Sequence, residues 1–215
     1  MKNLIRKELT LSIHPTAYLF LSLSAMLLIP SYPYLVAFFY TGLSVFFICL
    51  NGRENGDVPF MMLMPVAKRD IVRARFLLVM LLQIAQIALS VPFAVLRQNI
   101  MPEGNGAGMD ANLALLGCAF ILYGIFNIVF LTSYYRNISR VGIPFLVSSI
   151  VVFVWIGIVE ASTFLVPFVR EKLDTPDTMF RAEKLIVLLC GAGIYALLTY
   201  IAFRRSVISF EKQDL

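Results

Sequence analysis

Apolar residues fill most of the chain in six long runs, and short polar stretches separate them. The runs do not alternate apolar and polar residues as the strands of a membrane β-barrel do, so each run predicts a helix. A helix that crosses a bilayer needs about 20 residues, and spans are predicted at residues 16–30, 33–50, 76–97, 112–133, 142–165 and 184–203. We therefore expect an all-α polytopic membrane protein with six transmembrane helices in one domain, residues 1–215.

The composition indicates that the solvent is lipid. Of the 215 residues, 60% are hydrophobic and 14% are charged, against about 45–50% and about 25% in a soluble domain. A soluble monomer of this size cannot bury so much apolar surface, so that class is excluded. Cys49, Cys118 and Cys190 each lie within an apolar run, where we expect them to pack in the interior. Their spacing predicts neither a disulfide framework nor a metal site.

The basic residues are distributed unevenly between the predicted loops. With both termini on one side, 13 of the 18 Lys and Arg residues fall on that side and 5 on the other, which predicts that the termini are cytoplasmic. The net charge of +5 then reflects topology and does not indicate a nucleic-acid partner. Tyr32 and Tyr34 near one surface, and Tyr134 and Tyr135 near the other, are expected in interfacial aromatic belts.

Residues 1–14 have the pattern of an amphipathic helix that lies in the membrane surface. Leucine and isoleucine side chains share one broad face, and Arg6 and Lys7 lie largely opposite. Glu8 falls inside the apolar arc, where an ionised carboxylate is costly unless it is paired. It either extends to water or forms an ion pair, within this chain or with a partner, and the pattern leaves both open.

The loop at residues 51–75 is the most informative segment. Asn55, Gly56 and Asp57 predict a turn with a helix N-cap, and Pro59 is tolerated in a first helical turn. The short helix that follows is almost wholly apolar from Phe60 to Met64 and is too short to cross lipid. An apolar, methionine-rich segment flanked by charge either docks in a groove of a partner or rests in the inner leaflet.

Two segments carry a resemblance to a known family. The run from Leu63 to Phe76 (LMPVAKRDIVRARF) resembles the loop between the second and third spans of small permeases of type-two ATP-binding-cassette (ABC) exporters. The N-terminal run from Leu4 to Leu9 (LIRKEL) resembles their elbow helix. Ala67 departs from the pattern, because family members often have a Ser or Thr there that caps the next helix, a contribution of about 1 kcal/mol.

The resemblance implies a partner and a set of contact residues. Two permease chains, identical or related, form the pathway, and two ATPase subunits bind ATP and Mg beneath them, so this chain itself needs no cofactor. A coupling helix from about Asp57 to Met64 sits in a cleft of the ATPase. The implied contacts are Arg53, Glu54, Asp57, Phe60, Met61, Met62, Leu63, Met64, Lys68 and Arg69, with Arg6, Lys7 and Glu8 in the elbow helix.

No phosphate-binding loop is present, so we expect a transport subunit rather than an enzyme. The glycine cluster from Gly104 to Gly108 lacks the lysine of such a loop and follows no strand. Its composition is typical of a flexible surface linker. A membrane enzyme would need His, Asp, Glu or Cys clustered at one depth, and the sequence predicts no such cluster.

Residues 160–183 are expected to form an extracellular cap. Pro167 interrupts an apolar stretch before the charged run from Arg170 to Asp174. The resembled family closes its outer exit in this region, which makes Glu160, Phe164 and Phe168 candidate gate residues. The alternative is an ordinary loop at the interface.

Three amide side chains lie well inside the predicted spans: Gln83, Gln86 and Asn127. They either form hydrogen bonds between helices or line the translocation pathway. No Asp or Glu lies clearly at mid-membrane, which argues against a proton-coupled carrier. Two small-residue pairs, Ala114 with Cys118 and Ala192 with Ala196, permit close helix contact.

The function predicted is therefore the permease subunit of an ATP-driven exporter in a bacterial plasma membrane. An apolar pathway favours amphipathic or hydrophobic cargo, and the resemblance places peptides first. One alternative is the substrate-binding subunit of an energy-coupling uptake system, although the Ala-x-x-x-Ala face expected there is replaced by Ala17 followed by Leu21. A membrane protein for immunity or assembly that transports nothing is the other alternative.

Overall fold

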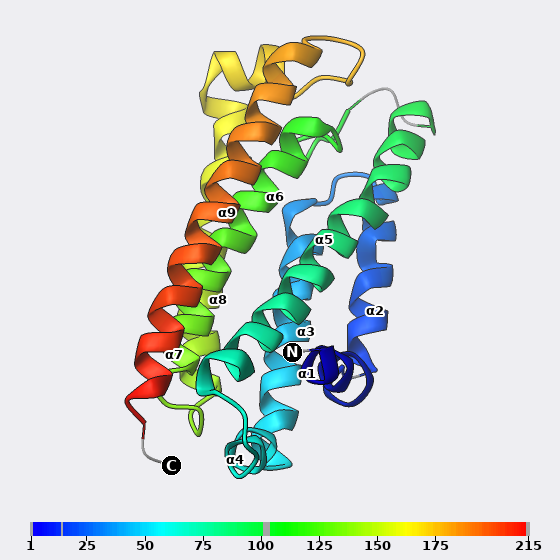
Figure 1. Cartoon of the computed structure of the whole chain (residues 1–215). Coiled ribbons are helices and arrows are strands. Elements are labelled where there is room, and N and C mark those ends of the chain that lie inside the picture. The colour runs from blue at the N-terminus through cyan, green and yellow to red at the C-terminus, as the bar shows by residue number, and fades with distance from the viewer. Residues whose placement is uncertain (1, 14, 101–103, 214–215) are drawn as a thin grey trace.

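The helices form one elongated bundle in the computed structural model, which describes residues 2–13, 15–100 and 104–213. In order they are α1 (Lys2–Lys7), η1 (Glu8–Ser12), α2 (Thr16–Ser22), η2 (Leu23–Leu28), α3 (Leu35–Glu54), α4 (Asp57–Met62), α5 (Lys68–Ile100), α6 (Leu113–Phe126), η3 (Asn127–Leu131), α7 (Thr132–Tyr134), α8 (Gly142–Leu165), η4 (Val169–Leu173) and α9 (Arg181–Glu211). The long helices run along the bundle, and α1 lies across it (Figure 1). Within the described ranges no strand occurs, and the all-α membrane fold is confirmed.

Among the residues that the structure describes, five segments are long and apolar enough to cross a bilayer: α3, α5, Leu113–Tyr134, α8 and α9. A sixth is reached only if Asn3–Ser12 and Thr16–Leu28, which meet at a bend of 81°, are counted as one broken span. The predicted span 16–30 is therefore a short helix of α2 and η2, with seven and six residues. At about 1.5 Å per residue it is much shorter than the hydrocarbon core.

The helix boundaries agree with the predictions where polar residues or prolines end the apolar run. α8 covers residues 142–165 as predicted. α5 and α9 extend well beyond the predicted spans 76–97 and 184–203, because a helix continues past the apolar part of its sequence into water. Ala67 supplies no side-chain cap, yet α5 begins at Lys68, where the Ala67 carbonyl accepts bonds from the Asp70 and Ile71 N–H groups at 2.8 and 3.3 Å.

α6 and α9 come into close backbone contact at two glycines. A Cβ atom added to Gly191 would lie 2.2 Å from the Gly117 carbonyl oxygen, and one added to Gly117 would lie 2.7 Å from the Val187 carbonyl oxygen. Close backbone approach through small residues is a common way for membrane helices to associate. The predicted pair Ala192 and Ala196 only borders this contact, since Ala196 is exposed.

The expected aromatic belts are wrong for three of the four tyrosines. Tyr34, Tyr134 and Tyr135 are fully buried. The Tyr34 hydroxyl donates to the Ile29 carbonyl at 3.1 Å and accepts from Arg97 Nε at 2.8 Å, and Tyr134 and Tyr135 pack against one another edge to face. The protein core continues through both ends of the bundle, so these rings contact helices rather than lipid headgroups.

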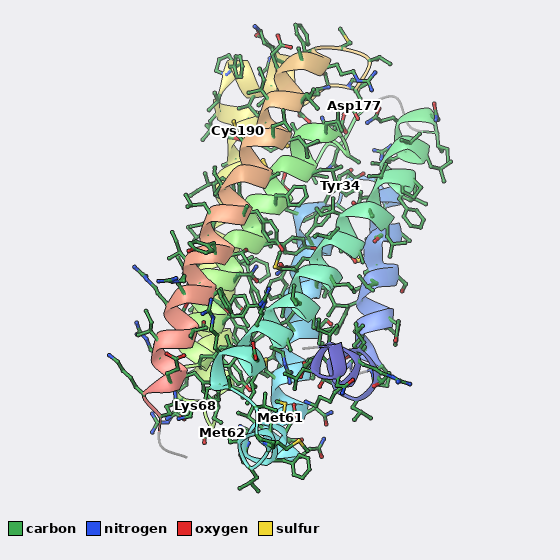
Figure 2. The ribbon with its side chains drawn as sticks, viewed as in Figure 1. Tyr34, Met61, Met62, Lys68, Asp177 and Cys190 are labelled. Carbon is green, nitrogen blue, oxygen red and sulfur yellow. The ribbon has the colours of Figure 1, made fainter. Side chains whose placement is uncertain are left out.

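The cysteines follow the packing prediction in two cases of three. Cys49 and Cys118 are buried, whereas Cys190 is exposed on α9 (Figure 2). Over residues 2–13, 15–100 and 104–213, no group of three or more His, Cys, Asp or Glu residues is placed to hold a metal ion.

Candidate functional site

The short helix α4 projects from the end of the bundle where α3 ends and α5 begins (Figure 1). One face packs inward through Val58 and Met61, which are buried. The other face exposes Phe60, and Leu63 and Met64 follow it directly, with 59%, 86% and 44% of their surfaces accessible. We call these three side chains the α4 apolar patch. An exposed cluster of large apolar side chains is typical of a docking surface.

The turn before α4 differs in detail from the prediction. Gly56 has φ of +62°, a left-handed conformation that favours glycine, and it occupies the cap position. No side chain of this turn caps the helix. The predicted turn is therefore present with Gly56 at the N-cap position, and the Asp57 carboxylate contacts two cations rather than capping the helix.

Four charged side chains join the elbow, α4 and α5. Arg75 on α5 contacts Glu8 of η1, with Nε and Oε2 2.8 Å apart, and contacts Asp57 of α4, with Nη2 and Oδ2 2.8 Å apart. Lys7 pairs with Asp57, and with Glu8 at 3.1 Å. Of the two alternatives for Glu8, the ion pair within this chain is confirmed. We call these four residues the ionic cluster.

The ionic cluster lies largely inside the protein. Glu8 is 1% accessible and Arg75 is 3% accessible. Two positive and two negative charges balance, which offsets the cost of taking them out of water. Removing one member of such a cluster leaves a buried charge uncompensated. The cluster therefore holds the elbow and α4 in fixed positions relative to α5.

A groove of about 870 Å³ separates the elbow from α4. Its lining is mainly apolar and includes Leu4, Leu11, Ile48, Met61 and Met64, with Lys7 and Asp57 also at its surface. Phe60 and Met64 belong both to this groove and to the α4 apolar patch. The patch and the groove thus form a continuous apolar surface at this end of the bundle.

The polar residues predicted around α4 separate into two sets. Arg6, Arg53, Glu54 and Arg69 are exposed, and Arg53 contacts Glu54 at 3.4 Å. Lys68 instead turns toward the C-terminal end of α9 (Figure 2), where its Nζ donates to the carbonyls of Glu211 and Gln213. A cation at the last carbonyls of a helix is favourable, so Lys68 joins α5 to α9.

Comparison with known families identifies the chain. A family model described as "ABC-2 family transporter protein" matches residues 3–211. The chain belongs to this family. It is therefore the membrane permease component of an ABC transporter, and components of this kind work with ABC ATPase subunits in a lipid membrane. No curated protein and no solved structure matches it.

A packed polar loop lies at the opposite end of the permease. Met109 N–H donates to Glu160 Oε2 at 2.9 Å, and Asn105 Nδ2 donates to the Tyr32 carbonyl at 2.9 Å. A Cβ on Gly108 would lie 1.5 Å from the Glu160 carboxylate. The interpretation of residues 104–108 as a flexible surface linker is wrong, because these bonds tie the segment to α8 and to the turn that precedes α3.

The candidate gate residues of the permease are not brought together. Glu160 faces the loop at residue 109, whereas Phe164 and Phe168 are exposed. Lys172 Nζ lies 5.2 Å from the centre of the Phe168 ring. Their gate role stays a prediction.

Sequence analysis did not single out the residues that hold the cap in place. Asn112 caps α6 by accepting a bond from the Leu115 N–H at 3.0 Å, and its Nδ2 donates to the Leu173 carbonyl at 2.7 Å. Asp174 Oδ1 accepts a bond from the Asp110 N–H at 2.7 Å. The asparagine before an apolar run was the available signal for the cap. The other partners lie more than 60 residues away in sequence.

Burial raises the pKa of the Asp174 carboxyl to about 6. The negative charge of Asp110 raises this pKa further, whereas the hydrogen bond from the Asp110 N–H and the positive charge of Lys184 lower it. Burial is also the main cause that raises the pKa of Asp110. Both carboxyls lie outside the helices that are long enough to span a membrane.

Two of the three amide side chains singled out in the sequence form bonds between helices. Gln83 and Asn127 exchange two amide hydrogen bonds of 2.8 and 3.0 Å. Tyr195 donates to Gln83 at 2.9 Å, and Asn127 donates to Thr199 at 3.0 Å. Gln86 is fully buried, and neither of its amide atoms has a partner among the described residues. The first two side chains join α5, η3 and α9.

Proposed function

We propose that α4 is the coupling helix of the permease and that it docks in a cleft of an ABC ATPase subunit. The α4 apolar patch supports this assignment, because large side chains such as Phe60 and Leu63 are exposed on, or directly after, a helix too short to cross lipid. The groove beside the patch adds apolar surface for the same partner. Arg53, Glu54 and Arg69 lie near α4 in the chain and are exposed for contacts at the rim of the cleft.

In this proposal the α4 end faces the cytoplasm of a bacterial cell. The excess of Lys and Arg in the loops of this end supports that orientation. α1 and the C-terminal end of α9 lie at the same end of the bundle (Figure 1), which is consistent with two cytoplasmic termini. In this proposal the membrane is the plasma membrane.

The ionic cluster supplies the mechanical connection that a coupling helix requires. When two ATPase subunits close around ATP and Mg, they displace the α4 helices of two permease chains. Asp57 contacts Arg75, so α4 carries α5 with it. α3 follows because only two residues separate its end from the start of α4. This is a rigid-body transition, and it opens and closes the pathway alternately.

We infer that the permease exports amphipathic or hydrophobic cargo, and peptides are the first candidate for that cargo. The middle of the spans is mostly apolar, with amide and hydroxyl groups such as Gln86, which suits cargo with few charges. The buried basic residues Arg75, Arg97 and Lys184 lie toward the ends of α5 and α9. The sequence places no Asp or Glu at mid-span, so the energy is expected from ATP rather than from protons. The cargo would leave past Glu160, Phe164 and Phe168.

The first experiment is purification of the tagged permease from its native membrane in mild detergent, followed by identification of the co-purifying subunits. An ATPase with a phosphate-binding loop is expected. Leu63→Asp is expected to reduce ATPase capture at least about tenfold, because an unpaired carboxylate is costly in an apolar cleft. Met62→Glu tests docking less specifically, because Met62 also packs against the core and its substitution would disturb that packing.

Leu165→Asp is the matched control, because Leu165 is also highly exposed but lies at the far end of the bundle. Capture that survives Leu63→Asp, or that Leu165→Asp reduces equally, would overturn the coupling assignment. Stimulation of the captured ATPase by amphipathic peptides in liposomes then distinguishes a transporter from an immunity or assembly protein.

A further inference from the structure

A second apolar groove lies on the membrane-facing surface between α5 and α9, which pack side by side toward the α4 end (Figure 1). It has a volume of about 280 Å³. Its walls are bulky and apolar: Phe76, Leu77, Met80, Tyr200 and Phe203, with Ala196 leaving room between them. Leu77 and Tyr200 are exposed, so the groove is open to the bilayer.

One end of the groove is positively charged. Arg73 lines the groove and is exposed. Arg204 follows Tyr200 by four residues on α9, so it lies one turn further along the same face, and it is exposed as well. Both arginines lie toward the end of the bundle that carries α4, where the apolar length of α5 begins.

The shape and charge together select one kind of ligand. From Arg73 to Met80 the helix rises about 10 Å at about 1.5 Å per residue, so an apolar chain beside these residues can reach deep into the membrane while an anionic group stays at the arginines. Bulky walls suit a flexible hydrocarbon chain, whereas a second protein helix packs best on small residues. Arginines at the membrane surface attract anionic lipids.

We propose that this groove binds an anionic phospholipid, with an acyl chain between α5 and α9 and the headgroup on Arg73 and Arg204. Tyr195 and Thr199 form the polar floor of the groove. Their hydroxyls contact Gln83 and Asn127, so a bound chain would rest directly on the bonds that join α5 to α9. The site is separate from the α4 apolar patch and does not depend on ATPase docking.

The test is native mass spectrometry of the purified full-length chain in detergent, titrated with phosphatidylglycerol or phosphatidylcholine of the same acyl composition. We expect retention of phosphatidylglycerol in preference to phosphatidylcholine. The double variant Arg73→Ala with Arg204→Ala is expected to lower phosphatidylglycerol affinity about tenfold. Ala196→Trp, which fills the groove and keeps both arginines, is expected to lower the affinity for both lipids.

The matched control is Arg136→Ala with Arg140→Ala. These arginines are exposed in the loop between α7 and α8, so the control removes the same charge outside the groove. An equal loss of phosphatidylglycerol affinity in this control would overturn the proposed site and indicate a general attraction of the lipid to basic residues on the protein surface. The proposed lipid site would also be overturned if Ala196→Trp left lipid retention unchanged. A change of oligomeric state in that variant would overturn it as well, because it would indicate that a second copy of the chain occupies the groove.

Discussion

Glu8 and Arg75 are 67 residues apart in the chain, yet their side chains meet in the interior with Nε and Oε2 2.8 Å apart. The contact joins a helix that lies across the bundle to the longest helix that runs along it. Both side chains are almost inaccessible to water. The elbow therefore depends on a specific charge as well as on its apolar face.

Loss of either charge is expected to destabilise the fold. Glu8→Gln or Arg75→Met should lower the free energy of unfolding by about 3–5 kcal/mol, because each leaves a buried charge uncompensated. The double variant, Glu8→Gln with Arg75→Met, should lower the free energy of unfolding by less than the sum of the two single losses. The measurement is thermal unfolding in detergent, followed by the fluorescence of Trp155, the one tryptophan of the chain. Arg69→Gln, at an exposed arginine of the same helix, should change little. A loss of stability in Glu8→Gln or Arg75→Met no larger than that in Arg69→Gln would contradict the role of the ionic cluster.

The contact between Gly117 and Gly191 predicts a sharp position dependence along α9. Gly191→Ala should destabilise the permease, since the new Cβ would lie 2.2 Å from the Gly117 carbonyl oxygen and the two helices must separate. Gly193→Ala should be neutral or stabilising, because no atom lies within 4 Å of that position and alanine favours the helix by up to about 1 kcal/mol. Unfolding temperatures of the two variants test this directly. Similar values for both would show that α6 and α9 do not touch at this point.

The buried amides should respond differently to the same change. Asn127→Leu removes two hydrogen bonds to Gln83 and one to Thr199, and should cost about 1–2 kcal/mol of unfolding free energy. Gln86→Leu should cost nothing or stabilise, because Gln86 has no partner among the described residues. Chemical unfolding in mixed micelles measures both. If Gln86→Leu keeps its stability and loses cargo-stimulated ATP hydrolysis, Gln86 lines the pathway.

The outer cap should become less stable as pH rises. The pKa of Asp174 is about 6 in the folded protein and about 4 in an unfolded chain. The folded state therefore holds the proton more tightly, and its contribution to stability is complete below about pH 4 and is lost as pH rises through about 6. Wild type should melt at a higher temperature at pH 5 than at pH 7. Asp174→Asn should reduce this difference in melting temperature between pH 5 and pH 7. An unchanged difference would show that another titratable group causes the pH dependence.

The sequence by itself determined the all-α membrane fold, the position of most helices and the exposed apolar helix between α3 and α5. These follow from the composition of each stretch, which is a local property. Gly142–Leu165 matched its predicted bounds because a polar loop precedes it and Val166 and Pro167 follow it. The family resemblance rested on equally local runs, from Leu4 to Leu9 and from Leu63 to Phe76.

Only the tertiary structure decided which side of each helix faces protein. Lipid and protein interior are both apolar, so the hydrophobic pattern along a membrane helix does not separate its buried face from its lipid face. Tyr34 and Cys190 were misplaced for this reason. The partner of Glu8, and the contact of Gly117 with Gly191, join segments that are far apart in the chain. Their meeting depends on how whole helices pack, and no local pattern contains that information.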